Sequence, residues 1–342
     1  MLREKRILLD HGSGGLATKK LIEGLFLRRI GNPVLSRMED SAVVDLPPGR
    51  LAFTTDSFVI DPIFFPGGDI GSLSVHGTVN DLAMQGASPL FLSLGLILEE
   101  GLDMDLLEKV ADSISRAAKE AGVVIAAADT KVVGKGQADK IFINTSGIGT
   151  LSSVTSLGVE KARPGDKIIV SGFIGDHGAC VLLARSGLPF EARIRSDSAP
   201  LNHLCKRILA ATRPSDVRLM RDPTRGGLAT VLNEIADASK TDIEILEESI
   251  PVRPEVQGVC ELLGLDPLYL ANEGKCVVVA DKEAAPAVLK AMKQDRLGKD
   301  AAIIGEVKAP VDQQGPKVVL RTKIGGERIV PMLTGEPLPR IC

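Results

Sequence analysis

The chain has 342 residues, of which 44% are apolar and 25% charged, and its formal net charge is −3. This composition is typical of a globular protein, and the length suits two domains of about 150 to 190 residues each. There is no basic excess, no Trp and a single Tyr, which argues against nucleic-acid binding. No apolar run is long enough to cross a membrane and no signal-peptide core follows the first residues, so we expect a cytoplasmic protein.

The first half of the chain alternates strands and helices. Alternating or β-branched apolar residues predict strands at 42–45, 51–58, 90–98, 123–128 and 141–151. Helical periodicity predicts helices over 70–84 and 104–121, and Gly122 ends the second. A polar stretch then leads to the turn at residues 163–166, and we place the domain boundary there.

The second half continues the alternation. Strands are predicted at 167–171, near 217, and at 243–246, 275–280, 302–307 and 317–321, with helices over 178–185, 201–211, 228–238 and 283–293. The chain is therefore expected to be α+β in two domains, residues 1–152 and 153–330, followed by a tail of residues 331–342. No fixed-period repeat is present.

A glycine-rich segment lies near the N-terminus. Residues 12–17 read GSGGLA and formally satisfy G-x-G-x-x-A, but no acidic residue follows about twenty positions later at a strand end, so a dinucleotide site is a weak reading. A flexible loop that covers phosphates fits better, because glycine permits close backbone approach and Lys19 and Lys20 supply charge. No P-loop motif occurs in the chain.

Acidic residues recur at predicted strand ends or beside glycine and threonine. They are Asp40, Asp56, Asp81, Asp129 and Asp222. Asn80 and Asp81 interrupt an apolar helix face, where a carboxylate must have a partner or bind a cation. Magnesium binds oxygen ligands together with substrate phosphates, so the set indicates an ATP site without a P-loop. Any one of these residues could instead be a helix cap or a turn residue.

The five cysteines are not spaced as a metal knuckle or a CxxC pair. Four lie in apolar segments and are predicted core residues: Cys180, Cys205, Cys260 and Cys276. Cys342 is the last residue, behind Pro337 and Pro339, which disfavour a helix or a central strand. The twelve residues from 331 reach up to roughly 40 Å, so we expect a mobile tail that carries a thiol between two sites. An incidental terminal cysteine is the alternative.

Together these segments resemble the HypE family of hydrogenase maturation factors from end to end. The likeness rests on DHGSGG (10–15), VNDLA (79–83), DTKVV (129–133), RPGD (163–166), DPTRGG (222–227), NEG (272–274) and PRIC (339–342). The carboxylates fit the wider PurM-like group, which includes aminoimidazole ribonucleotide synthetase and selenophosphate synthetase, whereas the terminal PRIC singles out HypE. The resemblance implies an N-terminal domain that forms a β-barrel at a homodimer interface, an α/β C-terminal domain and a flexible C-terminal tail.

The resemblance also implies a reaction. A HypE-like protein receives a carbamoyl group on its terminal cysteine from the carbamoyltransferase HypF and dehydrates the S-carboxamide to S-cyanate with ATP and Mg²⁺. ATP is needed because an amide oxygen is a poor leaving group until it is phosphorylated. The nitrile then passes to a HypC and HypD scaffold and becomes a cyanide ligand of the iron in [NiFe] hydrogenase.

Site residues follow from the same resemblance. Catalytic roles are implied for Cys342, Lys131 and Glu273. Magnesium ligands are expected at Asp40, Asp56, Asp81 and Asp222, and nucleotide contacts from Gly12, Gly14, Gly15, Lys19, Asn80, Asp129 and Thr130. Lys131 could merely bind phosphate, and which of Lys131 and Glu273 accepts the proton stays open.

Two other functions stay open as well. The first is another ATP-dependent synthetase of the PurM-like group. A selenophosphate-type enzyme would carry a reactive Cys or selenocysteine in the glycine-rich segment, which residues 12–20 lack, and an aminoimidazole-ribonucleotide-type enzyme would not need Cys342. The second is a non-catalytic thiol carrier that binds nucleotide as a switch.

Overall fold

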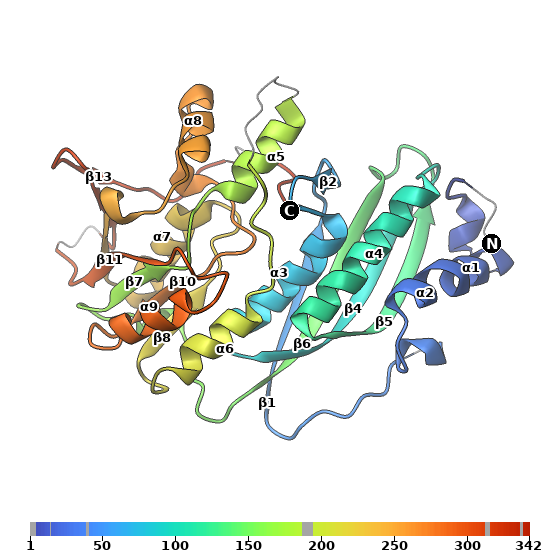
Figure 1. Cartoon of the computed structure of the whole chain (residues 1–342), viewed down its shortest axis with the longest axis horizontal. Coiled ribbons are helices and arrows are strands. Elements are labelled where there is room, and N and C mark those ends of the chain that lie inside the picture. The colour runs from blue at the N-terminus through green and yellow to red at the C-terminus, as the bar shows by residue number, and fades with distance from the viewer. Residues whose placement is uncertain (1–4, 14, 39–40, 187–193, 312–314, 336–337) are drawn as a thin grey trace.

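Two domains lie side by side in the protein, each built on its own sheet, and the C-terminus lies between them near β2 (Figure 1). The structure is a computed structural model that describes residues 5–13, 15–38, 41–186, 194–311, 315–335 and 338–342. The two-domain, mixed α/β organisation predicted from the sequence is confirmed.

The N-terminal domain contains a four-stranded sheet in the order β1-β6-β4-β5. β6 pairs antiparallel with β1 and β4, and β4 pairs parallel with β5. Helices α3 and α4 lie side by side across one face of this sheet (Figure 1). The bounds are β1 Arg50–Phe58, α3 Ile70–Met84, β4 Ser88–Glu99, α4 Met104–Ala121, β5 Val124–Val133 and β6 Ile141–Leu151, with α1 Leu16–Leu21 and α2 Leu27–Ile30 before them and the short β2 Phe64–Phe65 and β3 Gly68–Asp69 after β1.

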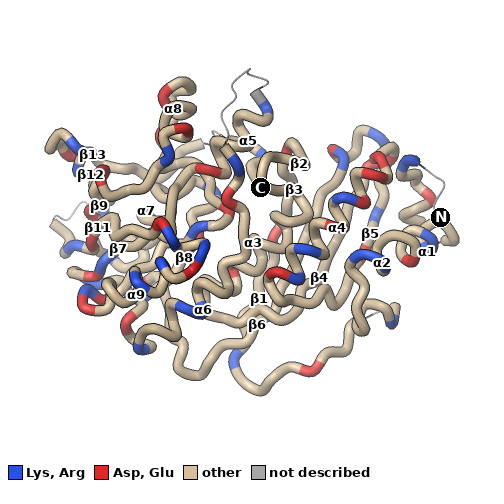
Figure 2. Tube along the Cα trace, viewed as in Figure 1, with Lys and Arg blue, Asp and Glu red and all other residues tan. Residues whose placement is uncertain are grey.

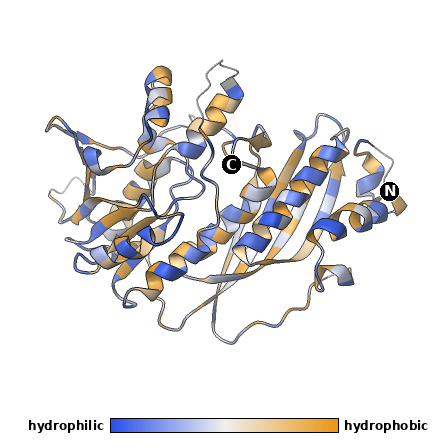
Figure 3. Ribbon diagram, viewed as in Figure 1, coloured by the Kyte–Doolittle hydropathy of each residue, from blue (hydrophilic) through white to orange (hydrophobic). Residues whose placement is uncertain are grey.

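Helix α4 shows how the local sequence sets these elements. Asp103 caps its start by accepting a hydrogen bond from the backbone N–H of Asp105, and Gly122 ends it at φ 72°, a conformation that glycine adopts without steric penalty. Apolar and polar residues alternate along the helix in a way that leaves one face apolar (Figure 3). That face joins the core of the domain, with Leu107 and Ile114 fully buried.

The other face of this sheet is not covered by a helix (Figure 1). Leu51, Phe53 and Ile97 are exposed there, and among the described residues no hydrogen bonds join β1 to β5. The expected β-barrel is therefore not closed within this chain.

The C-terminal domain contains a seven-stranded sheet in the order β13-β12-β9-β11-β7-β10-β8. Helix α7 packs on one face, and α6 and α9 pack on the other. The strands are β7 Lys167–Val170, β8 Val217–Arg221, β9 Asp242–Leu246, β10 Val277–Ala280, β11 Ala302–Lys308, β12 Val318–Arg321 and β13 Glu327–Ile329, and the helices are α5 Asp176–Ser186, α6 Asn202–Ala210, α7 Gly227–Ser239, α8 Pro254–Leu263 and α9 Ala285–Lys293.

Helices α5 and α8 of the C-terminal domain contribute side chains to the core of the N-terminal domain. Residues of both, such as Cys180 and Val256, belong to the same buried cluster as the N-terminal domain, and Leu338 and Ile341 of the C-terminal tail join it too. Acidic and basic residues are intermingled over both domains rather than gathered on one side (Figure 2). Every described helix is too short or too polar to span a bilayer.

Three expectations about elements need correction. Residues 42–45 form no strand, because no strand pairs with this segment in the part of the chain that is described. Helix α8 and strand β13 were not predicted, although Pro254 in the first turn and Gly264 at φ 67° are ordinary start and stop signals for α8. The expected mobile tail is not confirmed, since residues 338–342 are packed against the protein.

Candidate active site

Four carboxyl groups from four separate elements approach one another where the two domains meet. Asp56 lies on β1, Asp81 on α3, Asp222 directly after β8, and Glu273 in the loop before β10. Each of these acids is buried enough to have a raised pKa, and the charges of Asp56 and Asp81 raise the pKa values of both Asp222 and Glu273. The fold therefore gathers residues that are up to 217 positions apart, as Asp56 and Glu273 are.

The pKa values show how unfavourable this arrangement is for a full set of negative charges. Burial first, and then the charge of Asp81, raise the pKa of Asp56 to about 6 and that of Asp222 to about 7. Burial also raises the pKa of Asp81, and it raises that of Glu273 well above its usual range. Because buried like charges disfavour ionisation, the site would gain stability from a cation or from protons.

An open cleft of about 560 Å³ gives access to this cluster. Asp81 and Asp222 line it together with Arg225, and Thr54 donates its hydroxyl hydrogen to the Asp81 carboxylate at 2.8 Å. The cleft thus combines acidic groups, which can bind a cation, with a guanidinium group, which can bind phosphate.

No group of three His, Cys, Asp or Glu side chains is preassembled as a metal site among the described residues. Magnesium is usually held by one or two carboxylates together with substrate phosphates, so such a site need not be complete without nucleotide. Burial raises the pKa values of Asp56, Asp81 and Asp222, and a cation would offset the cost of ionising these acids, so the three residues fit a magnesium ion. The predicted ligand Asp40 lies outside the described residues.

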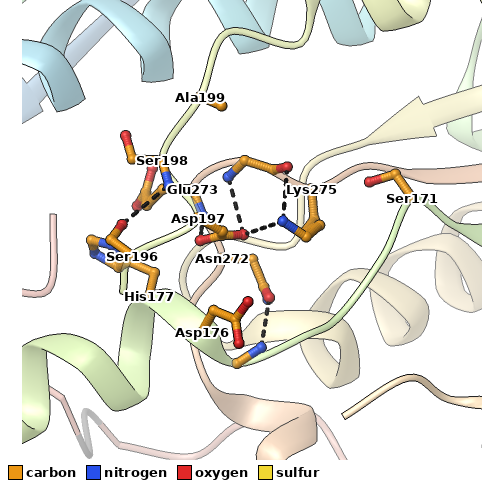
Figure 4. A network of polar contacts seen from close by, with 12 residues as sticks. Ser171, Asp176, His177, Ser196, Asp197, Ser198, Ala199, Asn272, Glu273 and Lys275 are labelled. Carbon is orange, nitrogen blue, oxygen red and sulfur yellow. Dashed lines mark hydrogen bonds and ion pairs between the residues drawn. The ribbon is translucent and has the colours of Figure 1, made fainter. Parts of the chain in front are cut away.

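The loop that carries Glu273 is held from both sides by buried side chains (Figure 4). Asn272 accepts a hydrogen bond from the backbone N–H of Gly175 at 2.7 Å and donates to the carbonyl of Pro223, next to Asp222, at 2.9 Å. Asp197 accepts from the backbone N–H groups of Glu273 at 3.1 Å and of Gly274 at 3.3 Å. This bonding sets the backbone from which the Glu273 carboxyl projects.

Asp197 is in turn paired with Lys275, whose ammonium nitrogen lies 3.1 Å from one carboxylate oxygen. Both side chains are almost completely buried. Burial alone would raise the pKa of Asp197, but the charge of Lys275, together with hydrogen bonds from Lys275 and the Glu273 backbone, holds it below its usual range. Asp197 therefore remains a carboxylate and can accept from the Glu273 loop.

Asn80 lies beside this loop and is fully engaged by protein groups. Its amide nitrogen donates to the carbonyls of Ala199 at 3.1 Å and Glu273 at 3.2 Å, and its oxygen accepts from Leu201 at 2.8 Å. A direct contact of Asn80 with nucleotide stays a prediction, whereas the observed bonds show a side chain that positions the Glu273 loop.

The remaining predicted residues gather at the opposite edge of the N-terminal sheet. Gly12 lies against β5, where a Cβ atom at its position would meet the backbone nitrogen of Val132 at 2.5 Å. Thr130 lies on β5, which is separated from β1 by β4 and β6. In the register of the sheet Thr130 is aligned with Phe58 of β1, three strand spacings or about 14 Å away. This edge is thus separate from the carboxyl cluster within one chain.

Side chains at this edge are open to solvent. The ammonium group of Lys131 lies 3.4 Å from Asp129, and both side chains are more than 60% exposed. Lys19 pairs with Glu23 at 3.8 Å on the neighbouring helix, and Gly15 precedes the first residue of α1. Gly14 lies outside the described residues.

The C-terminal tail ends between the domains. The backbone N–H groups of Val59 and Asp61 donate to the carbonyls of Cys342 at 3.0 Å and Arg340 at 3.3 Å, directly after β1. Arg340 donates to the Val59 carbonyl and to Asp139, each at 2.7 Å. These bonds place the last residue of the chain beside Val59, three positions after Asp56 and just past the end of β1.

Several residues of this region were not predicted from the sequence. His177, Ser196, Asp197 and Lys275 lie near the Glu273 loop (Figure 4). His177 also forms a hydrogen bond with the tail at Ile341. Lys275 directly follows the NEG motif and could have been suspected, but nothing in the spacing pairs it with Asp197, 78 positions upstream.

Two family models match the chain and together cover most of it. The N-terminal domain of AIR synthase related proteins matches residues 38–151, and the C-terminal domain of the same proteins matches residues 163–315.

Individual relatives match over nearly the full length. The carbamoyl dehydratase HypE of Bradyrhizobium diazoefficiens is 51% identical over 341 residues, which are 100% of this chain and 97% of the relative. A crystal structure of hydrogenase maturation protein HypE in complex with ATP superimposes with a TM-score of 0.93 at 51% identity, covering 98% of this chain and 99% of that one. A chain in a crystal structure of a HypE–HypF complex matches with a TM-score of 0.79 at 48% identity, and the match covers 91% of this chain and 99% of that one.

Proposed function

Because the chain belongs to the HypE family of carbamoyl dehydratases, which act in hydrogenase maturation, we propose that it removes water from an S-carboxamide on Cys342 and leaves an S-cyanate. The amide carbon–oxygen bond breaks after the oxygen has taken the terminal phosphoryl group of ATP, and both N–H protons leave as the nitrile forms. In sum, the S-carboxamide and ATP give the S-cyanate, ADP, phosphate and one proton. The nitrile supplies a cyanide ligand for the iron of [NiFe] hydrogenase.

The observation that carries this proposal is that the thiol-bearing terminus is bonded to Val59, three positions after Asp56 of the buried carboxyl cluster. The tail ends beside β1, the strand that holds Asp56, and it is linked to the Glu273 loop by the bonds of His177 and Asp197. Such an arrangement presents a group on the terminal sulfur to a site that can bind a phosphate-bound cation and remove protons.

We assign proton removal to Glu273. Its carboxyl group is buried at 3% exposure, and burial together with the charge of Asp222 raises its pKa, so the carboxylate is a strong base once it ionises. With the neighbouring aspartates neutralised, ionisation of Glu273 becomes easier. Lys131 is exposed and lies at the far edge of the sheet, which favours a contact with nucleotide phosphate over a role as the base.

Magnesium bound by Asp56, Asp81 and Asp222 would neutralise phosphate charge as the phosphoryl group is transferred. Arg225 lines the same cleft and can bind a phosphate oxygen. The glycine-rich segment with Gly12, Lys19, Asp129 and Thr130 is proposed to contact another part of the nucleotide.

The proposed partners follow from the family and from one surface of the chain. The HypE–HypF structure supports HypF as the carbamoyl donor, and a HypC and HypD scaffold is the proposed cyanide acceptor. A homodimer is proposed through the uncovered face of the N-terminal sheet, where Phe53 is 71% exposed, with the β-barrel closed between two chains. We place the protein in the cytoplasm, where its free thiols would be kept reduced.

Mass spectrometry of the C-terminal peptide tests the reaction. After incubation with HypF, its carbamoyl donor and Mg-ATP, the peptide that ends in Cys342 should gain one carbamoyl mass and then lose one water. A carrier without catalytic function would retain the carbamoyl group indefinitely, and a synthetase of another type would consume ATP without modifying this peptide.

A further inference from the structure

One histidine side chain holds the backbone of the thiol-bearing tail. His177 in the first turn of α5 is completely buried, and its Nε2 lies 2.8 Å from the carbonyl oxygen of Ile341, the residue before Cys342. Its Nδ1 lies 2.8 Å from the hydroxyl oxygen of Ser196. Phe65 packs edge-on against the ring at 5.4 Å, so the imidazole is fixed in orientation.

The hydrogen-bond partners of His177 determine which of its two ring nitrogens carries the hydrogen. The carbonyl of Ile341 can only accept, so Nε2 carries the hydrogen, and in the neutral ring Nδ1 must accept from Ser196. The Ser196 oxygen then accepts from the backbone N–H of Ser198 at 3.1 Å. Burial lowers the pKa of His177, which keeps the ring neutral and this order of donors unchanged.

The same segment continues to the catalytic loop. Asp197, between Ser196 and Ser198, accepts from the N–H groups of Glu273 and Gly274 (Figure 4). One end of the segment 196–198 therefore bonds the histidine that holds the tail, and its middle residue bonds the loop of the proposed base.

We propose that His177 is a positioning residue for the dehydration step: it holds the docked tail by the Ile341 carbonyl and, through Ser196 and Asp197, places that tail in a fixed relation to Glu273. The inference rests on the proposed function for its chemical consequence, but the docking itself can be measured without ATP or a carbamoyl donor. His177 does not touch the reacting atoms and acts only through the groups that it holds.

Alkylation of Cys342 measures docking directly. The other four cysteines are buried and Cys342 is half-buried, so iodoacetamide labelling of the C-terminal peptide reports release of the tail. Loss of one buried hydrogen bond corresponds to about a fivefold shift in a docking equilibrium, so His177→Leu should speed labelling of Cys342 by about that factor. His177→Gln keeps an amide N–H that can donate to the Ile341 carbonyl and should stay within about twofold of the wild type.

A matched control is available in His76. It is also buried, at 6% exposure, and its Nδ1 lies 2.9 Å from the Ser198 hydroxyl oxygen, but it forms no hydrogen bond with the described residues of the tail. His76→Leu should therefore alter stability without speeding the labelling of Cys342. If it speeds labelling as much as His177→Leu does, general loosening explains the result and the proposal is wrong.

Ser196→Ala tests the connection and leaves the imidazole in place. It should speed labelling less than His177→Leu, and the double variant should label no faster than His177→Leu alone, because Ser196 acts through the ring. Additive effects would show that Ser196 is independent of His177 and would overturn the connection. If His177→Leu does not fold, two other variants still test the proposal. An unchanged rate of Cys342 labelling, both in Ser196→Ala and in the double variant His177→Gln with Ser196→Ala, would overturn it.

The two chemical steps should respond in opposite directions. In His177→Leu a released thiol should be carbamoylated by HypF at least as fast as in the wild type, whereas loss of water from the S-carboxamide should slow by about tenfold because the group is no longer held near Glu273. Equal slowing of both steps would indicate a structural defect and contradict a positioning role. Absence of S-cyanate in the wild type would refute the proposed function and leave the docking result standing.

Discussion

At the scale of single residues, the site consists of buried carboxyl groups whose raised pKa values favour the protonated form. Asp222 is the clearest case, since burial and two neighbouring carboxylates raise its pKa to about 7. A carboxyl kept in this condition lowers stability near neutral pH and is retained only where its charge is useful.

Asp222→Asn should make the free protein more stable at higher pH. The folded-state pKa of about 7 lies above the usual 3.8, so between these two pH values the folded state binds more protons than the unfolded state. The free energy of unfolding therefore falls as the pH rises through this range. The variant should therefore melt higher than the wild type at about pH 8, by roughly 2 to 4 °C per kcal/mol regained, and no higher at about pH 4. Thermal unfolding across this range tests the expectation, and a variant less stable at pH 8 would contradict it.

The same variant should bind Mg-ATP more weakly, and so should Asp81→Asn. Removing one negative charge from a shared cation site affects the whole site, so the double variant should lose less than the sum of the two single losses. Calorimetry with Mg-ATP measures this. Wild-type affinity in both single variants would rule out the proposed magnesium site.

The cysteines divide into two chemical classes. Cys342→Ala should abolish S-cyanate formation and leave ATP binding and melting temperature nearly unchanged. Cys276 is completely buried beside Cys205, so Cys276→Ser should lower stability by about 1–3 kcal/mol before it affects chemistry. S-cyanate formed by Cys342→Ala, or activity lost by Cys276→Ser at an unchanged melting temperature, would contradict this division.

At the scale of elements, the tail is a docked segment rather than the free tether expected from its prolines. It is held by hydrogen bonds to Val59 and Asp61 after β1, by the His177–Ile341 hydrogen bond and by the Arg340–Asp139 ion pair. Leu338 and Ile341 are also buried. Its other end is anchored in the C-terminal domain, where the N–H of Val330 bonds Val318. The length between these anchors sets whether Cys342 reaches its place.

Deleting residues 332–335 removes about 13 Å of reach and should prevent docking. ATP binding should survive, because its proposed ligands lie upstream, but dehydration should stop. Glu273→Gln at full length is the paired control, in which the tail docks and the S-carboxamide accumulates because proton removal is impaired. Intact-mass measurement distinguishes them, and complete conversion to S-cyanate in either variant would refute tail delivery or the role of Glu273, respectively.

At the scale of the whole molecule, the two domains build one site between them, while the N-terminal sheet keeps one face uncovered. An uncovered sheet face with exposed Leu51 and Phe53 is a surface that natural proteins usually cover. We expect a second copy of the chain to cover it.

Phe53→Asp should convert the proposed dimer to monomers, because a buried unpaired charge in an apolar interface is strongly unfavourable. Ile324→Asp is the matched control, since Ile324 is 96% exposed in the turn between β12 and β13 of the other domain. Sedimentation velocity should show monomers for the first variant and dimers for the second. A dimeric Phe53→Asp would place the interface elsewhere.

The sequence by itself determined the class and order of most elements, because apolar periodicity, Asp103 and Gly122 act locally. It also supplied the candidate residues of the proposed site: the thiol at the terminus, the carboxylates and Glu273 lie in motifs that can be read from the sequence. It could not show that residues 42–45 lack a partner, since strand pairing depends on what else is nearby.

Only the tertiary structure decided which of these residues meet. It brought Asp56, Asp81, Asp222 and Glu273 together, and it left Lys131 at the far edge of a sheet. It also docked the tail against groups that no local pattern connects to it, such as His177 at a separation of 164 positions. The physical reason is that hydrogen bonds and charge interactions depend on the distances between atoms in space. Those distances are set when whole helices and sheets pack together, and the spacing of residues along the chain does not determine them.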